Sequence, residues 1–379
     1  MKRRAVLGLV GGGAVLAAAP GCSLDRTPSK ALAPWDTAGS AYSEPRMKAL
    51  SYAILAPNPH NRQPWLADLR EPGQITVYAE ESRRLPATDP YSRQITVGLG
   101  CFLELMAMAA AEDGIRVDFE LFPEGSDPEV LDGRPVAIAR FVDDASVAKD
   151  PLFAQVFARR SLKEPYDLAR PVDDGVLQTL VAAAGPGVLT DTTNELAMVQ
   201  QLRQLTDDAM RREFETPHTY KESVDLFRIG KAEIEANPDG IDFSGWFFEG
   251  LHTFGLFNRE VVLDPESTSF KQGLESQTEL AHTAMAHVWL VTETNTRLDQ
   301  IAAGRAWLRV NLAATAAGVG TQPMSQALQE FPEMAQYYAQ AHELLAPNGG
   351  TVQMLGRLGY GADVPPSPRW AVESRTIMA

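Results

Sequence analysis

The chain of 379 residues is long enough for two modest domains or one large domain, and its 45% content of apolar residues is ordinary for a packed globular protein. The formal net charge is −15 at pH 7, and no basic stripe offsets it, which argues against a nucleic-acid partner. An anionic small ligand would therefore need a local cluster of cationic residues.

The first 22 residues are typical of an export signal rather than of a folded element. A basic start, MKRR, precedes an apolar run that is too short and too glycine-rich for a membrane span. The pair Arg3–Arg4 favours the twin-arginine route over ordinary secretion. Gly21–Cys22 resembles the end of a lipoprotein cleavage box, but Ala19 stands where leucine is usual, so lipidation of Cys22 and attachment to a membrane stay open. We expect the protein in the periplasm or on the outer face of the cell envelope.

Residues 23–44 are rich in serine, proline and alanine and predict a linker. A first unit follows at 45–150. Its hydrophobic patterning predicts alternating helices and strands: a helix at 45–55, strands at 63–69 and 74–80, a long apolar helix at 92–113, and strands at 117–123 and 136–142. Cys101 lies in the long helix and is expected to be a buried apolar side chain. With Cys22 it is one of two cysteines, so the chain has no disulfide framework.

The second unit is predicted to span 151–379. Its expected elements are helices at 173–184, 195–213 and 297–318, and strands at 286–293 and 351–360. The long helices of the two units are both rich in small residues, and both follow strand-like segments. One interpretation is an internal duplication, with two α+β halves whose long helices pack together. The pattern alone leaves this duplication open.

A stiff polar segment, APNPHNRQPW, occupies residues 56–65. Its three prolines fix the local φ angle and lack an N–H group. Such a segment is either a rigid connection that closes a helix or a preformed edge that hydrogen-bonds a planar, polar ligand.

Two further segments carry candidate ligand contacts. The sequence RRSLK at 159–163 places three cations and a hydroxyl within five residues of an acidic protein. This is either a solvated basic turn or, together with Arg369 in PPSPRW, a clamp for one phosphate group, because guanidinium forks match phosphate oxygens. The sequence GVGTQPMS at 318–325 either only caps the preceding helix or also presents backbone N–H groups to a flat ligand.

Together these segments resemble the nitroreductase family. APNPHNRQPW is similar to the family pattern A-P-S-x-x-N-x-Q-P-W, RRSLK to R-x-S-x-[KR], GRAWLRVNLAATAAGVGTQPMS to the long helix with its flavin-contact loop, and GYGADVPPSPR to the closing segment. Ordinary members are homodimers that bind FMN between subunits. Here the first pattern lies in the first half and the others in the second, so the chain resembles the single-chain Acg-like branch. The resemblance implies a monomeric pseudo-dimer with one FMN, in an α+β fold whose long central helices pack between mixed or antiparallel sheets.

The resemblance also implies roles for individual residues. The phosphate and ribityl side of FMN would be held by residues of the second half: Arg159, Arg160, Ser161 and Arg369. The ring would be lined by Asn58, Pro59 and Asn61 with His60 close by, and the N5 region would be flanked by Pro323 and Met324. The remaining candidates for FMN contact are Gln63, Gln322, Ser325 and Pro368. Lys163 would lie near the N1/O2 edge, where a positive charge favours the anionic reduced flavin. Asn58 stands where the family usually has serine, and neither a catalytic side chain nor a metal site is implied.

Residues 214–275 depart from ordinary nitroreductases and resemble the lid that covers the flavin in the Acg-like branch. A partner-helix interface or plain core is the alternative. The resemblance implies two-electron transfer from NAD(P)H or another donor to a nitroaromatic, quinone or similar acceptor. If the lid blocks turnover, the protein would instead store FMN. A third hypothesis is an envelope lipoprotein that kept the fold and lost the ligand.

Overall fold

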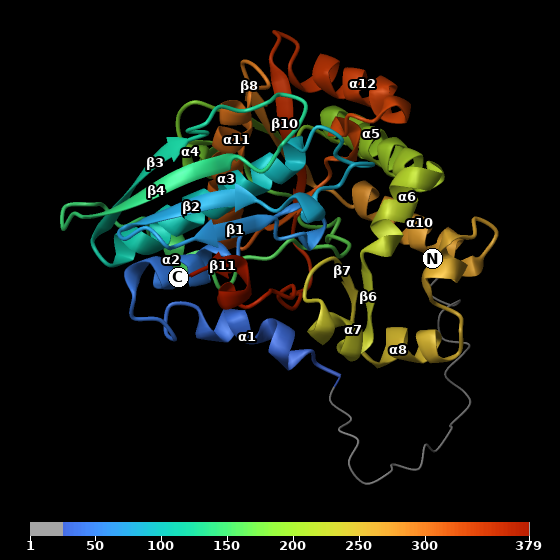
Figure 1. Ribbon diagram of the computed structural model, residues 1–379. Helices are drawn as coiled ribbons and strands as arrows, with labels where there is room; N and C mark the ends of the chain where they lie inside the picture. Colours follow the sequence, from blue (N-terminus) through green and yellow to red (C-terminus); the bar gives the residue numbers. More distant parts are fainter. Residues whose placement is uncertain (1–25, 379) are drawn as a thin grey trace.

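The computed structural model describes residues 26–378 (Figure 1). The expected export signal, with Arg3–Arg4 and Cys22, lies outside the described residues. The described chain is organised around two sheets and two long helices. Short 3₁₀ turns connect the main elements: η1 (Pro59–Asn61), η2 (Glu81–Arg83), η3 (Pro151–Gln155), η4 (Gln326–Leu328), η5 (Pro332–Met334) and η6 (Val372–Arg375).

The first unit contains the elements expected from its sequence, in the expected order. They are α2 (Pro45–Ala53), β1 (Trp65–Asp68), β2 (Gln74–Ala79), α3 (Arg93–Glu112), β3 (Ile115–Leu121) and β4 (Pro135–Asp143). The strands form a five-stranded sheet in the order β11-β1-β2-β4-β3. Strand β11 (Thr376–Ile377) comes from the end of the chain and pairs with β1 in parallel, whereas the other pairs are antiparallel. The chain end therefore completes the sheet of the first unit.

The second unit forms a four-stranded antiparallel sheet in the order β5-β8-β10-β9. Its elements are α4 (Asp174–Ala184), β5 (Leu189–Thr193), α5 (Leu196–Glu215), β8 (Ala286–Thr292), α11 (Arg297–Ala316), β9 (Gly320–Pro323), α12 (Ala335–Leu345) and β10 (Thr351–Gly359). The longer elements were expected. The sequence analysis missed β5, β9 and α12.

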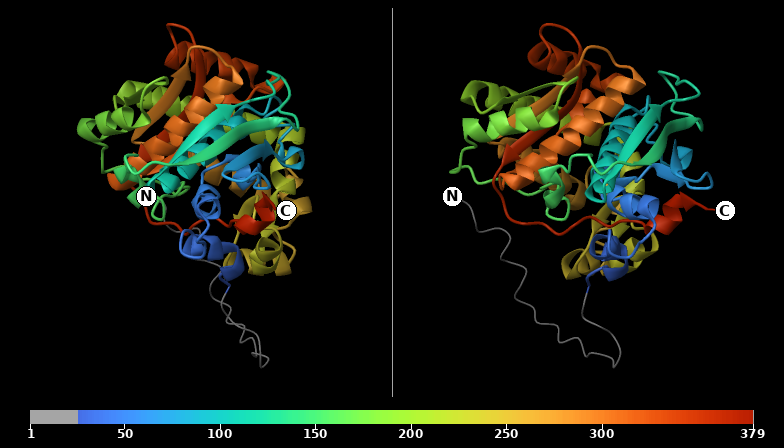
Figure 2. Two further views of the ribbon diagram at one scale, coloured as in Figure 1. Left: turned by 60° about the vertical axis from the view of Figure 1, so that its left-hand side comes forward. Right: turned by 90° about the vertical axis from the view of Figure 1, so that its left-hand side faces the viewer.

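The two long helices cross at the centre of the molecule, between the two sheets (Figure 2). Gly100 of α3 and Gly304 of α11 meet at the crossing, where a Cβ atom on Gly100 would lie 2.9 Å from the Cα atom of Gly304. Helix α3 is long and apolar enough to cross a membrane, but 89% of its apolar stretch is buried inside the protein. It is therefore a core helix, and the expected packing of the two long helices is confirmed.

Residues 214–275 form a separate layer beside the two sheets, at the lower right of Figure 1. The layer contains α6 (Pro217–Asp225), β6 (Phe227–Ile229), α7 (Gly230–Ala236), β7 (Ile241–Phe243), α8 (Trp246–Thr253), α9 (Arg259–Leu263) and the first part of α10 (Thr268–His282). Strands β6 and β7 pair in parallel. A small apolar cluster of its own, which includes Tyr220, Val224 and Phe270, holds the layer together.

The linker expected at 23–44 is partly wrong, because residues Ser29–Thr37 form helix α1. Trp35 is buried in the main core, and its Nε1 donates a hydrogen bond of 2.8 Å to the Ser367 carbonyl. Composition had suggested a linker because serine and proline are common there. Long-range packing of one tryptophan stabilises the helix instead, since short helices depend on tertiary contacts.

Candidate functional site

The loop that follows α2 has an unusual backbone. His60, Asn61 and Gln63 have positive φ angles of 47°, 49° and 48°. Residues other than glycine rarely adopt this left-handed conformation, and it persists where surrounding contacts hold it. Within the loop, the Asn58 side-chain oxygen accepts a hydrogen bond of 2.7 Å from the Gln63 N–H. The expected rigid edge at 56–65 is thus a strained loop with fixed side chains.

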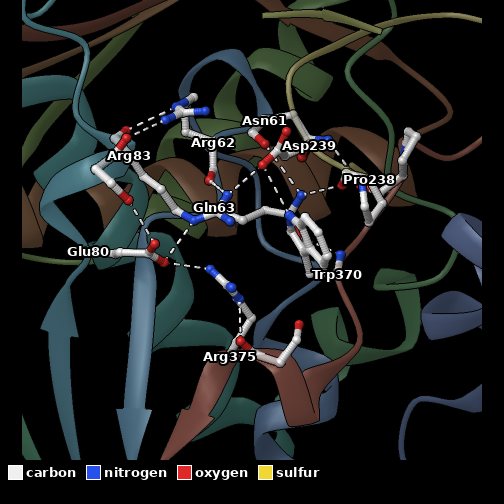
Figure 3. A network of polar contacts seen from close by, with 12 residues as sticks. Asn61, Arg62, Gln63, Glu80, Arg83, Pro238, Asp239, Trp370 and Arg375 are labelled. Atoms are coloured by element: carbon white, nitrogen blue, oxygen red, sulfur yellow. Dashed lines mark hydrogen bonds and ion pairs between the residues drawn. The ribbon is translucent and has the colours of Figure 1, made fainter. Parts of the chain in front are cut away.

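Gln63 joins this loop to two distant parts of the chain (Figure 3). Its side chain is fully buried. Its Nε2 donates a hydrogen bond of 2.7 Å to the Pro238 carbonyl, and its Oε1 accepts one of 2.9 Å from the Trp370 N–H. The loop, the layer at 214–275 and the C-terminal segment are therefore fixed together by one amide.

The structure brings Arg159, Arg369 and Asn61 together, as the sequence predicts. Arg369 donates from Nη1 to the Asn61 side-chain oxygen at 2.8 Å and from Nε to the Ile54 carbonyl at 2.8 Å. Arg159 and Arg369 both donate to the Leu55 carbonyl, at 3.3 and 3.2 Å. These carbonyls lie at the C-terminal end of α2, where a helix carries partial negative charge. Pro368 is buried beside Arg369, and its carbonyl accepts from Asn61 at 3.0 Å.

The arginine cluster, defined as Arg159, Arg160 and Arg369, has no carboxylate partner within 4 Å in the described part of the chain. Burial lowers the pKa of Arg159 to about 10, and burial together with the Arg159 charge lowers the pKa of Arg369 to about 9. The Nη1 atom of Arg159 is buried without a hydrogen-bond partner. Such a site favours an anion, because buried cations are costly unless they are paired.

Trp35 of α1 covers the arginine cluster, and the sequence analysis did not single it out. The guanidinium carbons of Arg160 and Arg369 lie 5.0 and 5.4 Å from the centre of its ring system. The Arg369 N–H also donates to the Ala31 carbonyl of α1 at 2.8 Å. Cations at this distance from an indole face are stabilised by its quadrupole. A lone tryptophan in a segment rich in small residues was the signal that could have identified it.

His60 and Lys163 approach each other from the two halves of the chain. Burial, with the positive charges of Lys163 and Arg62, lowers the pKa of His60 to about 4, so His60 is neutral at pH 7. Its Nε2 lies 3.1 Å from the Ser223 hydroxyl of α6, and its Nδ1 is buried without a partner. Lys163 itself is exposed, and Ser161 of the same segment is half-buried. The exposed ammonium is thus free to face a ligand beside the loop.

The candidate residues near β9 mainly contact the protein itself. Gln322 accepts a hydrogen bond of 2.6 Å from Arg357, and Ser325 donates one of 3.3 Å to a β10 carbonyl. Met324 is fully buried and packs against Met210 of α5, whereas Pro323 is half-buried in β9. These contacts hold Gln322, Met324 and Ser325 in place rather than pointing them at open space.

Arg357 is a second residue that the sequence analysis missed. It is fully buried in β10 and donates to the carbonyls of Leu162 and Glu164, at 3.2 and 2.7 Å. Through these bonds and its bond to Gln322 it ties the RRSLK segment to β9. A charged residue inside the apolar strand pattern TVQMLGRLGY was the available signal.

The layer at 214–275 is attached to the loop region by polar contacts (Figure 3). Asp239 pairs with Arg83 at 2.7 Å and accepts from the Trp370 indole at 3.1 Å. The Glu222 carboxylate accepts from the backbone N–H groups of Ala87 and Thr88, both at 2.9 Å. Since several of these groups are buried, the layer is held firmly over the loop.

The known proteins to which this chain is similar are named as nitroreductases. No family model matches the chain. A protein from Mycobacterium tuberculosis strain H37Rv, named "Putative NAD(P)H nitroreductase Rv3131", is 29% identical over 332 residues, which cover 84% of this chain and 87% of the relative. Over most of its length the chain is thus similar to relatives named as NAD(P)H nitroreductases. A further nitroreductase relative from the same strain, named acg, is 30% identical over 120 residues, or 31% of this chain and 36% of the relative.

Solved nitroreductase structures are also similar to this chain. The FMN-dependent nitroreductase NfnB from Mycobacterium smegmatis, in complex with NADPH, is 17% identical with a TM-score of 0.36, covering 59% of this chain and 95% of that one. A nitroreductase-named protein from Anabaena variabilis is 12% identical with a TM-score of 0.38, covering 76% and 69%. The relatives bear out the predicted family resemblance, and the structure itself confirms the predicted α+β architecture, with long central helices between a mixed and an antiparallel sheet. The residue-by-residue assignment of flavin contacts stays a prediction.

Proposed function

We propose that this protein is an FMN-dependent oxidoreductase that passes two electrons from NAD(P)H or another donor to a nitroaromatic, quinone or similar acceptor. One observation carries the proposal: Arg159 and Arg369 of the arginine cluster are buried without a carboxylate within 4 Å, and Arg369 contacts Asn61 of the strained loop. Sequence similarity supports the same activity, because the relatives that match most of this chain are named as NAD(P)H nitroreductases.

The donor set fits the phosphate of FMN. Guanidinium groups bind phosphate oxygens through parallel N–H donors, and the free Nη1 of Arg159 is one such donor. A phosphate would also offset the burial that lowers the pKa values of Arg159 and Arg369. Arg160, half-buried and stacked on Trp35, would bind on the same side.

The rim residues fit the remaining, planar part of the cofactor. Bound FMN would supply the two-electron chemistry, so the side chains need only bind, orient and exclude water. Asn61 is fixed by Arg369, and neutral His60 is fixed by Ser223, so the rim is ordered before a ligand arrives. The exposed ammonium of Lys163, whose charge acts on His60, would stabilise negative charge at the ring edge.

Flavin content tests the cofactor assignment. The purified protein should be yellow, and the substitutions Arg369→Ala and Lys163→Ala should each lower the amount of FMN retained after gel filtration. Arg140→Ala is a matched control, because Arg140 of β4 forms an exposed ion pair with Glu120 of β3 at 2.6 Å, outside the candidate site. A colourless wild type, or variants that retain as much FMN as the control, would refute the placement of the site.

Turnover tests the activity. Steady oxidation of NADPH in the presence of a nitroaromatic or quinone is expected. A second function, FMN storage, is favoured by the polar contacts that fix the layer at 214–275 over the loop, such as the bond from Gln63 to Pro238. A yellow protein that stays oxidised with NADPH but bleaches with dithionite would assign storage instead of catalysis.

We further propose that the protein is exported and anchored through a lipid on Cys22, and that it acts as a monomer whose two halves replace the subunits of a dimer. The signal-like start and the Gly21–Cys22 pair support export and anchoring. Cell fractionation with the wild type and a Cys22→Ser variant tests the anchor, since only the wild type should be retained in the membrane fraction. Light scattering of the purified protein tests the monomer.

A further inference from the structure

A cluster of exposed apolar side chains marks one surface of the layer at 214–275. We call it the aromatic patch: Trp246, Phe247, Phe254 and Leu256. Phe254 and Trp246 are 80% and 78% exposed, and they are the most exposed of the large apolar side chains in residues 26–378. Scattered exposed apolar residues are ordinary, but a contiguous group within eleven residues of chain indicates an interaction surface.

The patch is supported from below by a second set of aromatic rings. Phe248 and Phe257 directly follow patch residues in the chain, and their rings lie 5.4 Å apart. Both rings also contact Phe243 of β7, at 5.0 and 4.9 Å. The inner face of α8 and the turn after it are therefore packed, so the outer face is held in place while it remains exposed.

The start of the described chain lies beside this patch. Arg26 forms an ion pair of 3.1 Å with Glu249 of α8, within the same short helix that carries Trp246 and Phe247. In Figure 1 the beginning of α1 and helix α8 lie at the same lower edge of the molecule. Cys22 precedes Arg26 by four residues, and four residues of extended chain reach at most about 15 Å. A lipid on Cys22 would therefore enter its membrane close to α8.

We propose that the aromatic patch inserts into the surface of the membrane to which Cys22 is attached. Tryptophan and phenylalanine side chains on a short, surface-lying helix suit the interface between lipid head groups and acyl chains. The formal net charge of −15 argues against attraction to anionic lipids as the driving force. Apolar contact with zwitterionic lipid is the chemistry that the patch offers, and the binding should not weaken in high salt. The location of the patch rests on the proposed anchor, but the insertion is tested without any flavin.

The experiment imitates the anchor chemically. The chain from residue 22 onward, which contains every described element, is coupled through the Cys22 thiol to a maleimide-bearing lipid in phosphatidylcholine vesicles. Cys101, the other cysteine, is buried and does not compete for the coupling. Vesicles made with brominated phosphatidylcholine quench tryptophan fluorescence only when a ring enters the bilayer. Quenching is expected for the wild type, and it should be lost in Trp246→Phe and reduced at least about twofold in a Phe254→Ser, Leu256→Ser variant.

A matched control removes apolar surface elsewhere. Leu168 and Leu189 are 59% and 66% exposed and lie outside the layer, so a Leu168→Ser, Leu189→Ser variant should be quenched like the wild type. Absence of quenching in the coupled wild type, or quenching that persists in Trp246→Phe, would overturn the proposal. If light scattering instead shows a dimer, and the Phe254→Ser variant is monomeric, the patch binds a second copy of this chain and membrane insertion is rejected. None of these outcomes depends on FMN, so they test the membrane contact independently of the proposed cofactor site.

Discussion

Replacing Gly100 by alanine tests how tightly the two long helices cross. The new Cβ atom would clash most severely with the Ile301 carbonyl oxygen, and it would also lie 2.9 Å from the Gly304 Cα, where ordinary contacts begin near 3.4 Å. Both neighbours are backbone atoms, so no side-chain rotation relieves the clash and the helices must separate by about 1 Å. Overpacking of this kind costs about 3 kcal/mol at the upper end of its usual range, whereas the change from glycine to alanine in a helix returns about 1 kcal/mol. We expect a net loss of about 2 kcal/mol in the free energy of unfolding.

Gly273→Ala provides the matched control. Gly273 lies in the interior of α10, and a Cβ atom there would meet nothing within 4 Å. This variant should gain about 0.5–1 kcal/mol from helix propensity. Urea unfolding followed by circular dichroism measures both, and their midpoints should move in opposite directions. Equal midpoints for the two variants would show that the helices do not cross at Gly100.

Three further predictions concern buried polar groups. Burial raises the pKa of Glu213 to about 7, so its contribution to stability is present below its ordinary pKa and is lost as the pH rises through 7. Glutamine does not titrate, so the melting temperature of Glu213→Gln minus that of the wild type should be larger at pH 8 than at pH 5. An unchanged difference would contradict this. Asp239→Ala leaves the part-buried Arg228 without its carboxylate and the Trp370 indole without its acceptor, while Arg83 keeps Glu80. It should cost about 3–5 kcal/mol, measured by thermal unfolding, and a loss below about 1 kcal/mol would argue against the network. Burial raises the pKa of Cys101 to about 12, so a thiol reagent should modify it only after unfolding, and rapid modification of the native protein would show that it is accessible.

The long, regularly patterned elements could be predicted from the sequence because their signals are local. The small-residue helix at 92–113 and the alternating strand at 74–80 appear as α3 and β2 within two residues at either end. Helix α1 could not be predicted in this way, because its stability comes from Trp35, whose hydrogen bond to Ser367 spans more than three hundred residues of chain. Such contacts leave no periodic signal in the sequence.

Some residues of the candidate site could be predicted from the sequence, and others could not. The grouping of Arg159, Arg369 and Asn61 was predictable because each residue belongs to a recognisable segment. The role of Gln63 as a connector was not, since its partners Pro238 and Trp370 lie in segments whose position relative to the loop the sequence does not define. Motifs identified the residues, whereas the structure was needed to show what each side chain contacts.

Asn61 connects the arginine cluster to the layer above it. Its side-chain oxygen accepts from Arg369, its side-chain nitrogen donates to the Pro368 carbonyl, and its own carbonyl accepts from the Gly240 N–H at 3.3 Å. An anion that draws the Arg369 guanidinium toward itself would weaken the first of these bonds while the other two still hold the backbone at its positive φ. Asn61 therefore contacts both the arginine cluster and the 214–275 layer. Asn61→Asp would replace that neutral acceptor with a carboxylate beside Arg369, which would compete with a phosphate for the same guanidinium. We expect this variant to retain less FMN than the wild type, and FMN retention equal to the wild type would show that Asn61 and the phosphate do not share Arg369.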